Sequence, residues 1–244
     1  MSAKQGSNMV VFSISEVNKL RSQAETAGLV SNTDTNGWIK CDVDPMKLLA
    51  VFETLQIRDG LVLRTYRFCQ GGNGNAVVWT MPADAPFPQP VDCSRMEGPP
   101  KPPQALDRLM DAIDGDGTPW SYFSASLFAR EAQEFGAIWH GCYWSTHAIL
   151  GTDPWQCEPE AKDRRKRQPQ ASGKPEEWKW KQPVPKIWEP QFERTGDTIS
   201  ISFLTFSGLG WETIYQTTDS FSAGSYTCKT TQAVVAKGLG GFMF

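Results

Sequence analysis

Apolar residues in the first third of the chain recur at two different spacings. Where they adjoin or alternate with polar residues, the pattern predicts a strand; where they recur every three or four residues, it predicts a helix. Ser13 begins a capping box with Glu16. Asp44, followed by Pro45, marks the start of a second helix. The spacing therefore predicts strand, helix, strand and helix over residues 9–12, 13–28, 38–43 and 44–55.

Two β-rich runs follow, at residues 61–69 and 76–81, and a turn sequence joins them. Residues 70–75 read Gln-Gly-Gly-Asn-Gly-Asn. Because Asn and Gly tolerate positive φ, we predict a β-hairpin. A phosphate-binding loop is the alternative, and it is disfavoured because a strand rather than a helix follows it. The first block is thus predicted to be β-α-β-α-β-β.

Prolines divide the rest of the chain. Fifteen of the 17 lie within residues 82–103 and 154–190. Proline fixes φ and lacks a backbone donor, so dense proline excludes helix interiors and central strands. The two windows leave three foldable blocks, at residues 1–81, 104–153 and 191–244. We expect residues 82–103 to be an extended crossing.

The middle block has helical spacing. Residues 104–113 predict a short amphipathic helix, and Thr118 with Pro119 marks the start of another that ends at Gly136. Residues 137–150 are apolar and aromatic, and the pattern leaves helix or strand open, with a leaning toward strand.

The last block alternates apolar and polar residues between glycine-containing turns, which predicts an antiparallel meander. The expected fold class is α+β: an N-terminal β-α-β-α-β-β unit and a helical middle packed with a C-terminal antiparallel β-meander. We expect residues 1–153 and 191–244 to form one composite domain. Residues 154–190 would be a basic, proline-rich insertion or linker that protrudes near residues 156–186.

Bulk composition narrows the class of protein. The 244 residues are 40% apolar and carry a net charge of −3, which argues for no particular partner. The longest apolar run is far shorter than a membrane span, and no secretory signal begins the chain. Six cysteines are scattered without a C-x-x-C pair, and most of them are expected to be reduced thiols. We therefore expect a soluble, cytoplasmic protein that makes no membrane contact.

The two histidines of the chain lie close together in sequence, which makes them candidate polar or metal-binding residues with the nearby thiol. The candidate cluster is His140, Cys142 and His147. On a helix the two imidazoles would lie two turns apart, at ~10 Å, and on a strand they would point to opposite faces. Neither geometry completes a zinc site or a nucleophile–base pair. We therefore expect no catalytic residue, no metal and no cofactor, and interpret the histidines as structural.

Residues 114–118 read Asp-Gly-Asp-Gly-Thr and match the D-x-D-G-T string of haloacid-dehalogenase-type phosphatases. In that family the first aspartate follows a buried strand, whereas here a charged segment precedes it, and the rest of the family pattern is missing. The string also resembles half of a calcium loop, but Ala125 stands where the twelfth ligand would be. We interpret these residues as a polar connection and helix cap.

The segment 158–186 holds nine of the 24 Lys and Arg residues against five acids, in a chain that is otherwise acidic. Its candidate partner-binding residues are Arg164, Arg165, Lys166, Arg167, Trp178 and Trp180. A mobile linker is the simplest interpretation. Basic and aromatic residues also attract acidic protein surfaces, or single-stranded nucleic acid through phosphate contacts and stacking.

Three functional hypotheses follow. The favoured one is a non-enzymatic interaction or assembly factor that docks a protein partner through residues 158–186 and an aromatic surface. The second is a small-molecule-binding protein or enzyme, whose pocket near His140, Cys142 and His147 is lined by tryptophans. These would be Trp79, Trp139, Trp144 and Trp211. The third and weakest is single-stranded nucleic-acid binding through residues 158–186, which would be strongly salt-dependent.

Overall fold

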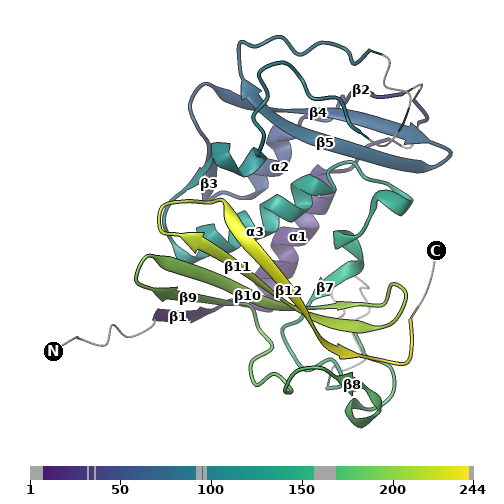
Figure 1. Cartoon of the computed structure of the whole chain (residues 1–244), viewed down its shortest axis with the longest axis vertical. Helices are drawn as coiled ribbons and strands as arrows, with labels where there is room; N and C mark the ends of the chain where they lie inside the picture. The colour runs from purple at the N-terminus through teal and green to yellow at the C-terminus, as the bar shows by residue number, and fades with distance from the viewer. Residues whose placement is uncertain are drawn as a thin grey trace. The chain divides into compact units, whose positions relative to one another are not determined.

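The computed structural model describes residues 8–31, 33–35, 37–91, 95, 98–156 and 169–241. Within this part of the chain, three α-helices accompany antiparallel strands, and the last four strands form a meander (Figure 1). The α+β class predicted from the sequence is therefore confirmed. The helices are α1 (Ile14–Ala27), α2 (Met46–Val51) and α3 (Pro119–Gln133).

The chain forms two compact units. The first comprises the described parts of residues 1–19, 145–223 and 228–244, and the second comprises those of residues 20–144 and 224–227. Both units therefore combine segments that are distant in sequence. The expected division at residues 154–190 stays a prediction, because residues 157–168 lie outside the described residues.

A seven-stranded antiparallel sheet is the main feature of the first unit. Its strand order is β1-β9-β10-β11-β12-β8, and β7 pairs with the part of β10 that extends beyond β9. The strands are β1 (Asn8–Val11), β7 (His147–Ile149), β8 (Lys179–Trp180), β9 (Gln191–Thr195), β10 (Thr198–Ser207), β11 (Thr213–Ser222) and β12 (Cys228–Lys237).

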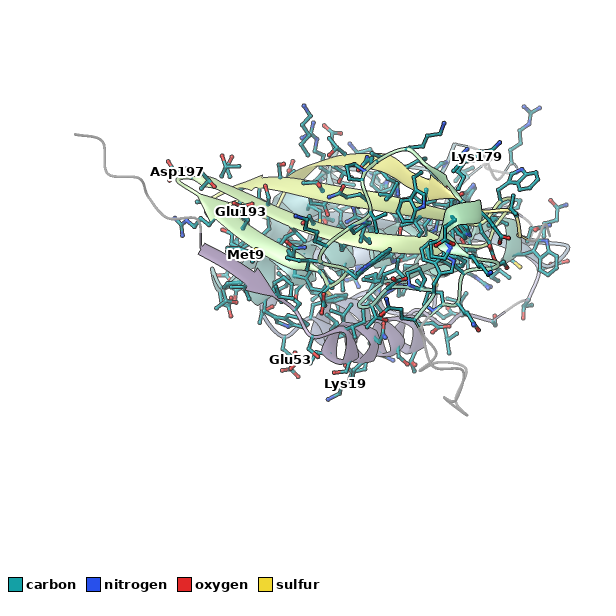
Figure 2. All side chains as sticks on the ribbon, turned by 90° about the horizontal axis from the view of Figure 1, so that it is seen from below. Met9, Lys19, Glu53, Lys179, Glu193 and Asp197 are labelled. Carbon is teal, nitrogen blue, oxygen red and sulfur yellow. The ribbon has the colours of Figure 1, made fainter. Side chains whose placement is uncertain are left out.

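Both edges of this sheet are short strands. Figure 2 labels Met9 on β1 and Lys179 on β8, which lie at opposite edges of the sheet. Strand β8 has only two residues, and Pro183 and Pro185 follow shortly after it. Short edges and nearby prolines limit further strand addition.

One face of the sheet carries an aromatic and aliphatic core. Strand alternation places Leu204 and Phe206 of β10 beside Ile214 of β11 on this face. Trp178 and Trp188 complete the buried layer, and Trp155 and Trp180 pack against it. The rings of Trp155 and Trp178 meet edge to face with centroids 5.0 Å apart. Aromatic residues from the proline-rich region thus form part of the core of the first unit.

The second unit contains two smaller antiparallel sheets, β2-β4-β5 and β3-β6. The predicted hairpin is confirmed, because β4 and β5 pair in register through a two-residue Gly71-Gly72 turn. Both glycines have positive φ, 59° and 79°, as a tight hairpin turn requires. The strands are β2 (Ile39–Lys40), β3 (Leu55–Ile57), β4 (Leu61–Gln70), β5 (Asn73–Pro82) and β6 (Ile113–Gly115).

The first proline-rich segment covers one face of this hairpin. Phe87 stacks on Tyr66 with ring centroids 4.5 Å apart, and the Tyr66 hydroxyl donates to the carbonyl of Pro88 at 2.7 Å. Trp38 donates from its indole Nε1 to the carbonyl of Arg95 at 2.9 Å. Pro82 ends β5, and the described residues between 83 and 103 contain no helix or strand. The extended crossing stays a prediction.

Helix α3 begins as the sequence predicts. Thr118 has extended backbone angles, and its hydroxyl accepts the N–H of Ser121 at 3.2 Å, with Pro119 in the first turn. The helix is buried along most of its length, and its Phe128 meets Phe52 edge to face at 5.5 Å. These contacts make α3 the centre of the second unit.

The helix predicted over residues 104–113 is wrong. Only Leu109–Ala112 forms a 3-10 turn, and the next residue enters β6. Gln104 has a φ of 62°, and the N–H of Leu106 donates to the carbonyl of Thr80 at 2.8 Å. Pairing with neighbouring strands therefore replaces the helix that the apolar spacing favours.

Two other predicted elements are shorter than expected. The strand predicted over residues 38–43 contains only Ile39–Lys40, and the helix predicted over residues 44–55 ends at Val51. Leu55 begins β3, because it pairs with β6 rather than continuing the helix. The segment left open, residues 137–150, forms two 3-10 turns and then β7.

In the described ranges, no helix combines the length and the apolar character that a membrane crossing demands.

Candidate functional site

The candidate cluster of histidines and cysteine is divided between the two units. Cys142 follows the 3-10 turn Trp139–Gly141 in the second unit, where it is half-buried. His147 begins β7 in the first unit and is 2% exposed. The side chain of His140 lies outside the described part of the structure.

Strand alternation directs His147 away from the hollow that its neighbours line. Ala148 pairs with Phe206, and both line an open hollow of about 510 Å³ together with Thr146. His147 occupies the opposite face. Its ring packs on Tyr215 with centroids 5.5 Å apart, and its Nδ1 lies 3.4 Å from the hydroxyl of Thr146. The structural interpretation of the two histidines stays a prediction.

The candidate partner-binding residues fall into two groups. Four lie outside the described residues: Arg164, Arg165, Lys166 and Arg167. Trp178 is 4% exposed, and its indole donates to the carbonyl of Ser172 at 2.8 Å. Trp180 is half-buried and donates to the carbonyl of Pro175 at 2.9 Å. Trp178 is thus a core residue in this structure, and its ring does not form part of an exposed surface.

The four tryptophans of the expected pocket have different environments. Trp79 packs with Trp38 beneath the proline-rich crossing, and Trp144 is 8% exposed. Trp139 is 54% exposed in the second unit, and Trp211 is 65% exposed in the first. Exposed aromatic surface, rather than a tryptophan-lined pocket, is what the structure shows at Trp139 and Trp211.

Two described thiols are poor nucleophiles. Burial is the main cause that raises the pKa of Cys41 and of Cys69. The Asp34 carboxylate, whose Oδ1 lies 3.8 Å from the Cys69 sulfur, raises the pKa of that thiol further. A raised pKa keeps a thiol protonated at neutral pH and so lowers its reactivity.

The acidic, histidine and cysteine side chains of the described residues are the candidate metal ligands. No group of three or more His, Cys, Asp or Glu side chains there is placed to hold a metal ion. Asp114, the first aspartate of the D-x-D-G-T string, lies on the short strand β6 and pairs with Arg58 at 3.3 Å. It therefore sits on an exposed ion pair and not at the end of a buried strand.

The most prominent exposed feature of the second unit is residues 138–144, which we name the aromatic loop. Trp139 and Tyr143 are each 54% exposed. Both are large aromatic residues of the kind enriched at protein interfaces. The loop follows α3, and the backbone contacts that hold it in place are extensive.

The tip of the β4–β5 hairpin supports the start of the aromatic loop. Ile138 and Gly74 exchange two backbone hydrogen bonds, at 2.9 and 3.2 Å. Gly141 lies so close to this tip that a Cβ there would be 2.3 Å from the carbonyl oxygen of Gly74. Only glycine permits this approach at position 141, so the sequence has the residue that lets the loop rest on the hairpin.

Glu131 of α3 and the C-cap residue Glu134 hold the other end of the aromatic loop. The Glu134 carboxylate accepts the backbone N–H groups of Tyr143, at 2.6 Å, and of Trp144. The Trp144 indole donates to Glu131 at 2.8 Å, and Arg21 lies 4.4 Å from the Trp144 ring centroid. Trp144 is thus a buried anchor, and the charged groups around it are engaged within the unit.

The backbone of Trp139 is strained. Its φ is 52°, in the left-handed region that large side chains rarely adopt. The turn that contains it is closed by the N–H of Cys142, which donates to the carbonyl of Trp139 at 2.9 Å. Strain of this kind persists where the surrounding contacts impose it, and it concentrates at functional sites. The aromatic loop is therefore our candidate functional site.

No family model, curated protein or solved structure matches this chain.

Sequence reasoning identified Trp139 as a candidate but did not single out Tyr143 or Glu134. The spacing of aromatic residues did not reveal which rings are exposed, because residues 137–150 have no regular periodicity. The glycines at 74 and 141 were visible, but their mutual contact joins residues far apart in the chain.

Proposed function

We propose that this protein is a non-enzymatic interaction factor that binds a partner protein through the aromatic loop. The observation that carries the proposal is the 54% exposed side chain of Trp139 on a strained, firmly held backbone. We also propose that the protein acts in the cytoplasm, the location expected from its sequence.

Rigid presentation of aromatic rings favours binding. A preorganised side chain loses little conformational entropy when a partner covers it. Tryptophan and tyrosine dominate the residues whose truncation weakens protein complexes most. Trp139 and Tyr143 are residues of these two types. The backbone of the loop that carries them is held by the β4–β5 hairpin and by Glu134, which limits the entropy lost on binding.

The charges near the loop favour an apolar partner surface. Arg21 pairs with Glu131 at 3.2 Å, and Glu134 is held by backbone amides. These groups are already engaged, so the loop offers rings rather than charges to a partner. We therefore expect binding that depends weakly on salt, in contrast to nucleic-acid binding through phosphate contacts.

The test is quantitative affinity purification with three tagged proteins: wild type, a Trp139→Ala/Tyr143→Ala double variant, and Trp211→Ala as the exposed-tryptophan control. Losing about 2 kcal/mol at an interface residue weakens binding by roughly thirtyfold. We expect at least one partner to be recovered by wild type and the control but to fall more than tenfold with the double variant. The partner should also remain bound when salt is raised. Equal recovery by all three proteins would contradict the proposal, as would steep salt dependence.

A further inference from the structure

We propose that the hollow beside Glu212 in the first unit binds an organic cation of the ammonium or guanidinium class. The hollow has a volume of about 510 Å³. Its described walls come from four places: β7 and the residue before it, residues 169–172, the end of β10 with the turn to β11, and the segment after β12. They are Thr146, Ala148, Pro169, Ser172, Phe206, Gly208, Glu212 and Gly241.

Glu212 is a buried acid in the wall of this hollow, 8% exposed. Two backbone hydrogen bonds fix its main chain. The N–H of Glu212 donates to the carbonyl of Gly240, and the carbonyl of Glu212 accepts the N–H of Gly238, both at 2.8 Å. Its Oε1 accepts the hydroxyl of Ser172 at 2.7 Å, and its Oε2 accepts the Ser172 backbone N–H at 3.1 Å. The carboxylate is therefore held in one orientation by two neutral donors.

The charge of Glu212 has no counterpart among the described residues. The ion pairs found there join other residues: Arg21 with Glu131, Arg58 with Asp114, and Lys101 with Asp107. A carboxylate offers about four acceptor positions, and Ser172 fills two. With no opposite charge among the described residues, this buried carboxylate is unfavourable unless a cation reaches it. The open side of the hollow provides the route for one.

The walls favour an organic cation over a metal ion. Calcium and magnesium require several oxygen ligands, and no cluster of acidic, histidine or cysteine side chains placed for a metal occurs in the described ranges. Phe206 and Ala148 add apolar surface beside the carboxylate. One carboxylate next to an aromatic wall suits a guanidinium or ammonium group, which gains both an ion pair and a cation–π contact.

Glycine at position 240 is part of this arrangement. A Cβ there would lie 2.9 Å from the Ser172 hydroxyl and 3.0 Å from the Glu212 carboxyl carbon. Any side chain at this position would displace the carboxylate or Ser172. The close approach of the C-terminal segment thus depends on this glycine.

The experiment uses the full chain and small probes in a titration followed by amide NMR. Methylguanidinium and methylammonium are the charged probes, and methylurea is the neutral probe of the same shape as methylguanidinium. The tripeptide Gly-Arg-Gly, with blocked ends, tests whether a peptide side chain binds better than a free cation. We expect the Ser172 and Gly240 amide signals to shift with the charged probes and not with methylurea.

The matched variants are Glu212→Gln, which keeps the shape and an acceptor for Ser172, and Glu193→Gln on β9 as the exposed control. We expect affinity for the charged probes to fall at least tenfold in Glu212→Gln and to be unchanged in the control. Equal binding of methylguanidinium and methylurea to the wild type overturns the proposal without any variant. Unchanged affinity in a folded Glu212→Gln protein also overturns it. Neither outcome bears on the aromatic loop, which belongs to the other unit.

Discussion

The hydroxyl of Tyr226 lies 2.9 Å from the Oγ of Ser121, in the first turn of α3. The same hydroxyl accepts the N–H of Gly117 at 2.8 Å, and the Tyr226 ring stacks on Tyr122 at 4.8 Å. Residues 224–227 form the turn between β11 and β12, yet they belong to the second unit. A single tyrosine therefore satisfies polar groups at the start of the central helix of that unit.

We predict that Tyr226→Phe lowers the free energy of unfolding by about 1–2 kcal/mol, because the buried Oγ of Ser121 loses its partner and the N–H of Gly117 loses its acceptor. Tyr215→Phe is the control, since the contact that the Tyr215 ring makes with His147 does not use its hydroxyl. Urea denaturation of both variants measures the difference. Equal stabilities would show that the hydroxyl of Tyr226 contributes nothing to the fold.

Gly115→Ala should be destabilising by about 1–3 kcal/mol, the usual effect of overpacking. The new Cβ would lie 2.5 Å from the Tyr226 ring, which stacking and hydrogen bonds hold in place. Gly28→Ala is the control, because a Cβ there meets its neighbours at ordinary distances of 3.5 Å or more. In a Tyr226→Ala background, the effect of Gly115→Ala should nearly vanish. A cost that persists in the double variant would assign the effect to the backbone of β6 instead.

The strain at Trp139 predicts an unusual order of stabilities. Glycine adopts a φ of 52° without steric cost, whereas alanine does not. Trp139→Gly should therefore be more stable than Trp139→Ala by about 1 kcal/mol, the reverse of the usual preference. Thermal unfolding of the two variants tests this. If alanine were the more stable, the left-handed backbone at this position would be wrong.

The raised pKa values of Cys41 and Cys69 predict slow alkylation. At pH 8 both thiols should react with iodoacetamide more slowly than in guanidinium-denatured protein, because burial leaves less thiolate. The rates should rise with pH beyond the range where an unperturbed thiol has already reached its plateau. Mass spectrometry of peptides after timed labelling gives each rate. Equal native and denatured rates would contradict the prediction.

The pKa of Asp116 is lowered, whereas the pKa values of the two thiols are raised, and it makes the stability of the protein depend on pH. Burial acts to raise the pKa of Asp116, but hydrogen bonds from the side chain and backbone of Thr118, with a further one from Ser121, outweigh it and lower the pKa below 3.8. A lowered folded-state pKa contributes stability that is complete above the unfolded value and is lost as the pH falls through the folded value.

The stability advantage of wild type over Asp116→Asn should thus be constant from neutral pH to about pH 4 and should shrink below it. Asp84→Asn, an exposed aspartate after β5, provides the baseline. Urea titrations at a series of pH values measure both differences. A difference that grows toward acid pH would reverse the sign and exclude this assignment.

Local signals in the sequence were the reliable ones. The Gly71-Gly72 turn and the Thr118 cap act within a few residues, and the structure has both. The short strands β2, β3 and β6 are held by partners far along the chain, so apolar spacing alone did not predict their bounds. The fold class followed from the sequence because most long strands belong to local hairpins.

The candidate sites were harder to predict, for a related reason. Trp178 lies in a charged, proline-rich segment, and composition favours exposure there. It is instead buried in the core cluster that contains Phe206 and Ile214. Glu212 has no motif around it, and its surroundings come from segments near residues 172 and 240. Such sites depend on contacts between distant segments, which a single sequence does not reveal.

The pairing of β1 with β9 has a consequence for synthesis of the chain. Val11 pairs with Gln191 and Asn8 with Arg194, so β1 meets its partner only after most of the protein has been translated. At ~5–20 residues per second, β1 waits on the order of ten seconds or more on the ribosome. The β4–β5 hairpin, by contrast, closes within microseconds of its emergence. The seven-stranded sheet is therefore completed late in the synthesis of the chain, after β9 has been translated.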